Sequence, residues 1–211
     1  QRVTVDPVLP CVVRGIDPPC EQCRNGQYTR CENFAEGNLA PGGHIGGCAD
    51  TGGSWGPFIV AHPHMIFPVP DGVTDENAIL VDALAAAIPP VLRHLPPNDD
   101  TVLIIGAGVL GICTVVALRR LGSKARIIVV SKYRFQSQTA THFGADDVVD
   151  ARGGDYYARV AESTGGRLYQ PFIGKPVMMG GADVVYECVG TDSAVRDALW
   201  FAKGGGRVAL V

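Results

Sequence analysis

The chain contains 211 residues, of which 46% are hydrophobic, and it has 18 Lys and Arg against 21 Asp and Glu, for a net charge of −3. This charge balance provides no basic surface for nucleic acid or an anionic membrane, and the hydrophobic content excludes a globally disordered chain. The 27 glycines and 15 prolines exceed the usual share and favour an α/β or β-rich architecture over a helical bundle.

Residues 1–72 are predicted to form a β-rich domain. Alternation over Arg2–Val8 indicates a strand, the glycine-rich stretch 42–56 indicates turns, and Phe58–Val60 and Met65–Phe67 indicate two short strands. Because no signal peptide precedes the first residue and the last residues are those of a buried strand, we expect a piece of a longer, cytoplasmic protein.

Four of the seven cysteines cluster near the start of the chain with the spacing C-x8-C-x2-C-x7-C. A tetrahedral Zn²⁺ requires four converging thiolates, and a C-x2-C turn supplies two of them. The alternative is a pair of disulfides in a secreted domain, which the odd cysteine total disfavours. Four protein ligands leave no open position for substrate, so we predict a structural zinc held by Cys11, Cys20, Cys23 and Cys31.

A linker region is predicted over residues 73–98. Thr74 can cap a helix, and the apolar run Ala78–Ile88 continues it until Pro89 and Pro90 break or kink the pattern. We therefore expect a helix between two domains.

Strands and helices alternate over residues 99–211, which predicts an α/β domain: a Rossmann-like parallel sheet with helices on both faces, truncated at its C-terminus. The uncharged stretch Thr101–Leu118 has the length of a membrane span, but its three glycines and charged flanks fit a strand, a turn and a buried helix better. Residues 165–181 have no clear period and are interpreted as an inserted loop. We expect strands at Val102–Ile105, Arg126–Val130, Asp147–Val149, Asp183–Glu187 and Arg207–Val211, and helices at Val109–Leu121, Arg134–Phe143, Tyr156–Ser163 and Ala194–Ala202.

A G-x-G-x-x-G motif follows the first of these strands and opens a helix, which is the context of a dinucleotide site. Gly106 is expected to make the tight turn, Gly108 to let backbone N–H groups approach a pyrophosphate, and Gly111 to let the helix lie close to the strand. The alternative is a glycine-rich turn without a ligand. The predicted cofactor-binding residues here are Gly106, Gly108, Val109, Leu110 and Gly111.

The end of the second strand bears on the type of coenzyme. NAD-binding folds usually place an acidic residue there, whereas this chain has Ser131, followed by Lys132 and Arg134. A hydroxyl group and two cations can accept a 2′-phosphate, so we predict NADP in preference to NAD. The alternative is that both cations are only solvated. Cys188, Val189 and Gly190, at the end of the fourth strand, are predicted to complete the crevice.

These features resemble the zinc-dependent medium-chain alcohol dehydrogenase family. The cysteine lobe and the segments Phe67–Gly72, Leu80–Leu84, Val102–Gly108, Phe143–Asp146 and Asp183–Gly190 occur in the order of that family, over nearly the whole chain. The resemblance implies a GroES-like catalytic domain, partly present here, a Rossmann coenzyme domain, and oxidation of an alcohol or polyol by hydride transfer to a nicotinamide cofactor. It also implies a small-molecule substrate and a homo-oligomer for the intact protein.

Two departures from the family pattern matter. Cys11 and Cys20 are nine positions apart where the family has three, so Asp17 is a substitute oxygen ligand to consider. The family's catalytic zinc uses a cysteine and a Gly-His-Glu histidine before the lobe, and this sequence contains neither. The resemblance leaves Asp82, where similar enzymes have a third zinc ligand, although it could equally be a solvated helix residue. The five histidines are expected to be structural or solvated, and His62 and His64 could share one face of a strand.

We therefore expect a fragment of a zinc-dependent NAD(P)-dependent alcohol dehydrogenase that is inactive alone. One alternative is a zinc-free reductase of the same fold, whose relatives generally lack the cysteine lobe. Another is a non-catalytic nicotinamide-nucleotide-binding or sensor module.

Overall fold

The structure is a computed structural model that describes residues 1–173 and 176–211. The chain forms two compact units, Gln1–Ile79 and Leu80–Val211, called unit 1 and unit 2 below. The boundary separates two helices, α2 (Asp75–Ala78) in unit 1 and α3 (Val81–Arg93) in unit 2.

Unit 1 consists mostly of turns around a small core. Its β1 (Val3–Val5) pairs antiparallel with β2 (Ile66–Pro68), and its other elements are α1 (Glu21–Arg24) and the 3₁₀ turns Tyr28–Arg30 and Pro63–Met65. The buried side chains of Leu9, Cys48 and Met65 form its apolar centre.

The prediction of a strand at Phe58–Val60 was wrong. Phe58 and Val60 are each 91% exposed, and within the described residues no strand includes them. Their apolar character therefore does not lead to burial, because a short apolar run becomes a strand only where a neighbouring strand or core accepts it. The predicted strand at Arg2–Val8 is confined to β1, and just beyond it the side chain of Asp6 accepts a hydrogen bond from the backbone N–H of Val8.

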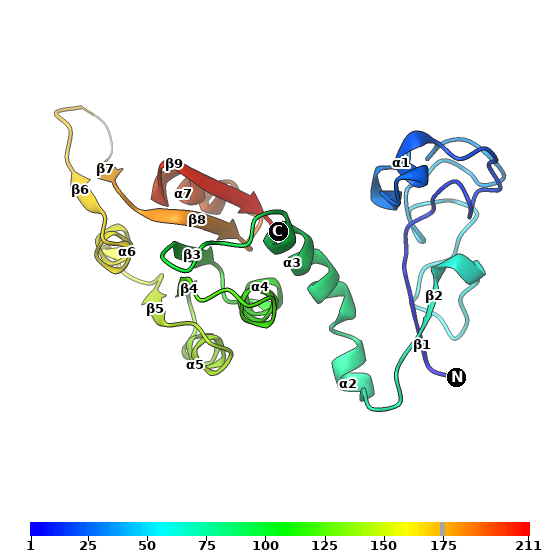
Figure 1. Ribbon diagram of the computed structural model, residues 1–211, viewed down its shortest axis with the longest axis horizontal. Coiled ribbons are helices and arrows are strands. Elements are labelled where there is room, and N and C mark those ends of the chain that lie inside the picture. The colour runs from blue at the N-terminus through cyan, green and yellow to red at the C-terminus, as the bar shows by residue number, and fades with distance from the viewer. Residues whose placement is uncertain (174–175) are drawn as a thin grey trace. The chain divides into compact units, whose positions relative to one another are not determined.

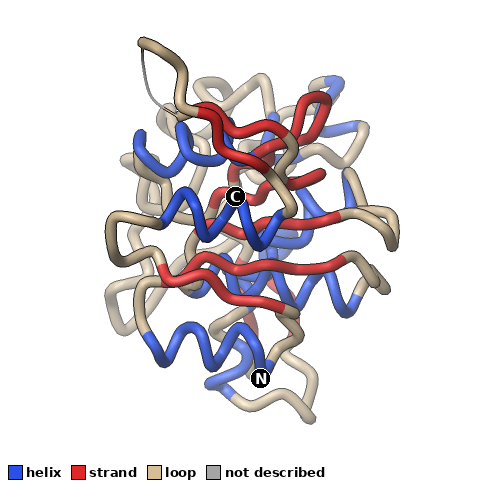
Figure 2. The backbone as a smooth tube through the Cα atoms, turned by 90° about the vertical axis from the view of Figure 1, so that its left-hand side faces the viewer, coloured by secondary structure: helices blue, strands red, loops and turns tan. Residues whose placement is uncertain are grey.

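Unit 2 contains a five-stranded, fully parallel sheet in the order β5-β4-β3-β8-β9, which confirms the predicted α/β Rossmann-like fold (Figures 1 and 2). The strands alternate along the chain with helices α4 to α7, as the sequence predicts. The bounds are β3 (Thr101–Ile105), α4 (Val109–Arg120), β4 (Arg126–Ser131), α5 (Arg134–His142), β5 (Asp147–Asp150), α6 (Tyr156–Thr164), β8 (Ala182–Glu187), α7 (Asp192–Phe201) and β9 (Ala202–Leu210).

Successive residues of the central strands enter two different cores. Ile104 and Val129 pack on one face of the sheet, with side chains from α3, α4 and α5. Leu103 and Ile128 pack on the other face, with side chains from α6 and α7. The strands are buried on both faces, so they appear in the sequence as continuous apolar runs. Because β3 connects onward to β4 on one side and pairs with β8 on the other, the order of strands changes direction between β3 and β8.

The interpretation of residues 165–181 as an inserted loop missed a pair of short strands. This segment contains β6 (Arg167–Tyr169) and β7 (Val177–Met179), which form an antiparallel pair; residues 174–175 of the segment lie outside the described residues. Met178 is buried in the core on the α6 and α7 side of the sheet, and Leu168, its partner in the pair, packs against the same core. Strands of three residues are too short to produce a clear period in a sequence.

Two element ends also differ from the prediction. Helix α3 continues through Pro89 to Arg93, since burial of Ala87 and Val91 favours the helix over the loss of backbone hydrogen bonds. Strand β9 begins earlier than expected, with a register shift between its pairs with Ala182 and Val184. Among the described residues, no helix combines the length and apolar character needed to cross a bilayer.

Candidate metal and dinucleotide sites

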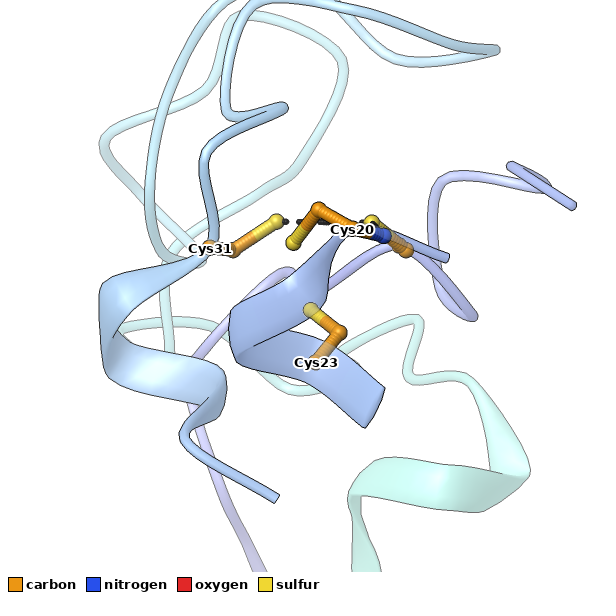
Figure 3. A group of neighbouring side chains, drawn as sticks. Cys20, Cys23 and Cys31 are labelled. Atoms are coloured by element: carbon orange, nitrogen blue, oxygen red, sulfur yellow. Dashed lines mark hydrogen bonds between the residues drawn. The ribbon is translucent and has the colours of Figure 1, made fainter. Parts of the chain in front are cut away.

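The structure brings the four clustered cysteines of unit 1 together. The sulfur atoms of Cys11, Cys20, Cys23 and Cys31 all lie within 4.8 Å of one another. Cys20 is the N-cap of α1 and Cys23 lies within this helix, while Cys31 follows the next 3₁₀ turn (Figure 3). All seven cysteines are free thiols, and the closest approach between Cys11 and Cys31 is a sulfur contact of 3.7 Å. Four converging sulfurs are a donor set that suits a tetrahedral zinc ion.

Cys11 belongs to this group despite its unusual spacing. Its sulfur accepts hydrogen bonds from the backbone N–H of Cys20 and from the side-chain amide of Asn33, both at 3.4 Å. Among the described residues, the only group of cysteine, histidine or acidic side chains that could hold a metal is this set of four cysteines, and it does not include Asp17. A substitute oxygen ligand is therefore not needed to complete the site.

The thiols of the cluster differ in acidity. Hydrogen bonds from the backbone, that of Glu32 most of all, lower the pKa of the Cys20 thiol to about 6. Burial raises the pKa of Cys23 to about 12 and also raises the pKa of Cys31. In the metal-free protein Cys20 is therefore the thiol that loses its proton first of these three.

In unit 2, the glycine motif has the steric properties of a nucleotide-binding turn. Gly106 has a φ of +96°, and a Cβ atom there would lie 2.6 Å from Cγ2 of Val189. A Cβ atom at Gly111 would lie 1.8 Å from the carbonyl oxygen of Gly106, so helix α4 can approach the turn only with glycine there. Gly108, by contrast, has no atom within 4 Å of its Cβ position, which leaves its outer side open.

This turn fits a dinucleotide. Gly108 is the N-cap of α4, and Val109 and Leu110 follow it in the first turn, where backbone N–H groups lack helical acceptors. An exposed pyrophosphate would receive hydrogen bonds from these N–H groups and would be stabilised by the helix dipole. The space beside Gly108 lets the phosphate approach the backbone closely.

The end of β8 lies beside the same turn. The backbone N–H of Cys188 donates to the carbonyl of Ile105 at 3.0 Å, and Cys188 also contacts the hydroxyl of Thr114 in α4 at 3.8 Å. Burial raises the pKa of the Cys188 thiol to about 12, so this thiol keeps its proton at neutral pH. Val189 and Gly190 continue the turn, and the predicted crevice residues therefore lie together where the strand order changes direction.

The predicted coenzyme residues at the end of β4 are one buried hydroxyl group, in the last residue of the strand, and two exposed cations beyond it. Ser131 is buried and its hydroxyl lies 2.5 Å from that of Ser137 in α5. Lys132 and Arg134 are exposed, with the ammonium group of Lys132 6.0 Å from the ring centre of Tyr133. The cations are therefore available to a ligand.

Asp82 lies in the first turn of α3 and is exposed. A carboxylate is favourable at a helix N-terminus without any metal, so the position of Asp82 does not require one. A zinc-ligand role for Asp82 stays a prediction.

His62 and His64 do not share a strand face, the possibility that their spacing left open, because both lie at a 3₁₀ turn. His62 caps the 3₁₀ turn Pro63–Met65, where its Nδ1 atom accepts a hydrogen bond from the backbone N–H of His64. The ring of His64 packs edge-on against Tyr28, and no group that could hold a metal includes either histidine in the part of the chain that the structure describes.

Two buried charged residues were not predicted from the sequence. Arg14 is fully buried in unit 1 and donates to five backbone carbonyls. Glu187, the last residue of β8, is 2% exposed. The sequence signal for Glu187 was a lone acidic residue at the carboxyl end of an apolar strand, just before the predicted crevice residues. Arg14 gave no sequence signal, because its acceptors lie as far away as Gly42.

Comparisons with known proteins agree with this arrangement. Residues 109–211 match the zinc-binding dehydrogenase family. The L-idonate 5-dehydrogenase of Vitis vinifera is 28% identical over 212 aligned residues, which cover 100% of this chain and 50% of that protein. The sorbitol dehydrogenase of Bacillus subtilis is 25% identical over 210 residues, covering 100% of this chain and 51% of that protein.

A solved structure from Sinorhizobium meliloti, described as a zinc-binding dehydrogenase bound to NADP, superposes with a TM-score of 0.69. It is 26% identical, and the match covers 99% of this chain and 53% of that one. The chain spans about half the length of the curated relatives it matches.

Proposed function

Because residues 109–211 match the zinc-binding dehydrogenase family, we propose that the chain supplies the zinc lobe and the coenzyme-binding unit of an enzyme that oxidises an alcohol or polyol to a carbonyl compound. The observation that carries this proposal is the turn at Gly106–Gly111, which has open space beside Gly108 and a helix N-terminus behind it. A bound nicotinamide coenzyme would supply the hydride acceptor.

The residues of the chain would act on this coenzyme by binding and orientation. The first turn of α4 would hold the pyrophosphate, and the Cys188–Gly190 turn would close the neighbouring side of the crevice. Lys132 and Arg134 would bind a 2′-phosphate, which is why we propose NADP as the preferred coenzyme.

The cysteine cluster would hold one zinc ion in a structural role, because its four sulfurs leave no position for a substrate. For a catalytic zinc, Asp82 is the candidate ligand that the resemblance leaves in this chain. We therefore propose that this chain alone binds coenzyme without turning over an alcohol.

Calorimetric titration of the zinc-loaded chain with NADP and NAD tests the proposal. We expect saturable binding of NADP, weaker binding of NAD, and about one zinc per chain by elemental analysis. No uptake of either nucleotide would contradict the dehydrogenase assignment. Coenzyme binding that persists with no alcohol oxidation in the intact natural protein would instead favour the second candidate, a non-catalytic nucleotide-binding module.

A further inference from the structure

Glu187 is a buried carboxylate without a cationic partner. None of the ion pairs between described residues includes it. One carboxylate oxygen accepts hydrogen bonds from the backbone N–H groups of Val189 at 2.7 Å and Gly190 at 3.0 Å, and the other lies 3.2 Å from the same N–H of Gly190. Burying a carboxylate costs free energy, and this cost indicates that the turn shaped by Glu187 has a function.

The turn held by Glu187 belongs to the proposed dinucleotide crevice. Gly190 has a φ of +77°, a conformation that the two hydrogen bonds to Glu187 stabilise. Val189, which precedes Gly190 in this turn, has its Cγ2 atom against Gly106, the first glycine of the nucleotide-binding turn. The carboxylate therefore controls the shape of one wall of the crevice at the position where parallel sheets bind their ligands.

We infer that Glu187 is a positioning residue for the nicotinamide coenzyme, acting through the backbone of Val189 and Gly190. This inference rests on the proposed function. The carboxylate is enclosed beneath the turn and acts by fixing the turn before the ligand arrives, which reduces the ordering cost of binding.

The opposite end of β8 offers a matched control. Asp183 also accepts a backbone hydrogen bond, from Thr101 at 2.8 Å, and pairs with Lys203. It lies at the amino end of the strand, away from the crevice, because ligands of parallel sheets bind at the carboxyl ends. Replacing Asp183 therefore disturbs the same strand without changing the turn that faces the coenzyme.

The test compares three variants of the zinc-loaded chain. Glu187→Met keeps the length of the side chain but removes both acceptor oxygens, Glu187→Gln keeps one oxygen able to accept from both N–H groups, and Asp183→Leu is the control. The affinity for NADPH and NADH is measured from the fluorescence of the bound reduced nicotinamide. We expect Glu187→Met to weaken binding by about tenfold or more. Glu187→Gln should restore most of the affinity, and Asp183→Leu should leave it unchanged while lowering the melting temperature.

A second measurement covers the case in which Glu187→Met does not fold. In the unmodified chain, hydrogen exchange of the Val189 and Gly190 amides should slow on addition of NADPH, whereas exchange of the Thr101 amide should not. Equal affinity in Glu187→Met and the unmodified chain, equal losses in Glu187→Met and Asp183→Leu, or unchanged exchange of the turn with coenzyme bound would each overturn the inference. An unmodified chain that binds neither nucleotide would overturn the proposed function itself, and the inference with it.

Discussion

The carbonyl oxygen of Gly106 occupies the space that any side chain at Gly111 would need, since a Cβ atom there would lie only 1.8 Å away. The conflict is with backbone, so no side-chain rotation can relieve it. The N-terminus of helix α4 lies at the proposed crevice because the helix packs close to the end of β3.

Gly111→Ala is therefore expected to destabilise unit 2. Alanine normally stabilises a helix by about 1 kcal/mol relative to glycine, but overpacking against backbone costs about 1–3 kcal/mol and should exceed that gain here. Thermal unfolding followed by circular dichroism measures the outcome. Gly108→Ala is the control for stability, because its Cβ position is open; as alanine is only a poorer N-cap than glycine, it should destabilise unit 2 less than Gly111→Ala does, but it should bind NADPH more weakly, since the methyl group meets the pyrophosphate. A stable, coenzyme-binding Gly111→Ala variant would contradict the prediction.

Loss of one thiol should release the zinc. Cys11→Ser is expected to lower the zinc content from about one ion per chain and to destabilise unit 1, because only three sulfurs would remain. Elemental analysis after dialysis against a mild chelator checks this. Cys48→Ser is the matched control: Cys48 is buried in the same unit, but its thiol donates to the carbonyl of Ala40 at 3.2 Å and lies outside the cluster. Full zinc retention by Cys11→Ser would show that Cys11 is not a ligand.

The metal-free cluster should react selectively. At pH 7 the Cys20 thiol, with a pKa of about 6, is mostly thiolate, whereas Cys23, with a pKa of about 12, is protonated. Iodoacetamide is expected to modify Cys20 first, with a rate that falls as the pH drops through about 6 and the thiolate gains a proton. Peptide mass spectrometry identifies the site, and added zinc should protect it. Faster modification of Cys23 would count against this assignment.

The two exposed cations after β4 should decide the coenzyme preference. The double substitution Lys132→Ala and Arg134→Ala is expected to weaken NADPH binding by about tenfold through loss of charge-assisted hydrogen bonds, and to leave NADH binding nearly unchanged. Lys124→Ala is the control, since Lys124 is an exposed cation shortly before the other end of β4. Equal affinities of the unmodified chain for NADPH and NADH would exclude the preference.

Arg14 should be essential for the fold of unit 1. Its guanidinium donates to the carbonyls of Leu9, Glu36, Leu39, Ala40 and Gly42. Arg14→Met leaves these acceptors without their donor, and we expect a loss of about 3 kcal/mol or more in the free energy of unfolding. Denaturant unfolding of the zinc-loaded chain measures it. Arg24→Met, at an exposed position in α1, should change stability by less than about 0.5 kcal/mol.

Local pattern was enough to predict the parallel sheet, its main helices and the glycine turn. The runs at β3, β4 and β8 are apolar because both faces of a parallel sheet are buried, and this requirement acts on each strand separately. The steric task of Gly111 likewise depends on Gly106, only a few positions earlier in the chain.

Only the tertiary structure decided which distant groups meet. Cys11 joins the sulfur cluster because the fold brings the side-chain amide of Asn33 to its sulfur. Arg14 donates to carbonyl acceptors up to 28 positions away. Phe58 and Val60 stay exposed for the converse reason: no partner strand reaches them within the described residues. The role proposed for Glu187 also depends on a distant contact, because the turn that it holds packs against Gly106, far earlier in the chain. Periodicity records what each segment buries, but not which distant groups it contacts, because those contacts form only when the whole unit has folded.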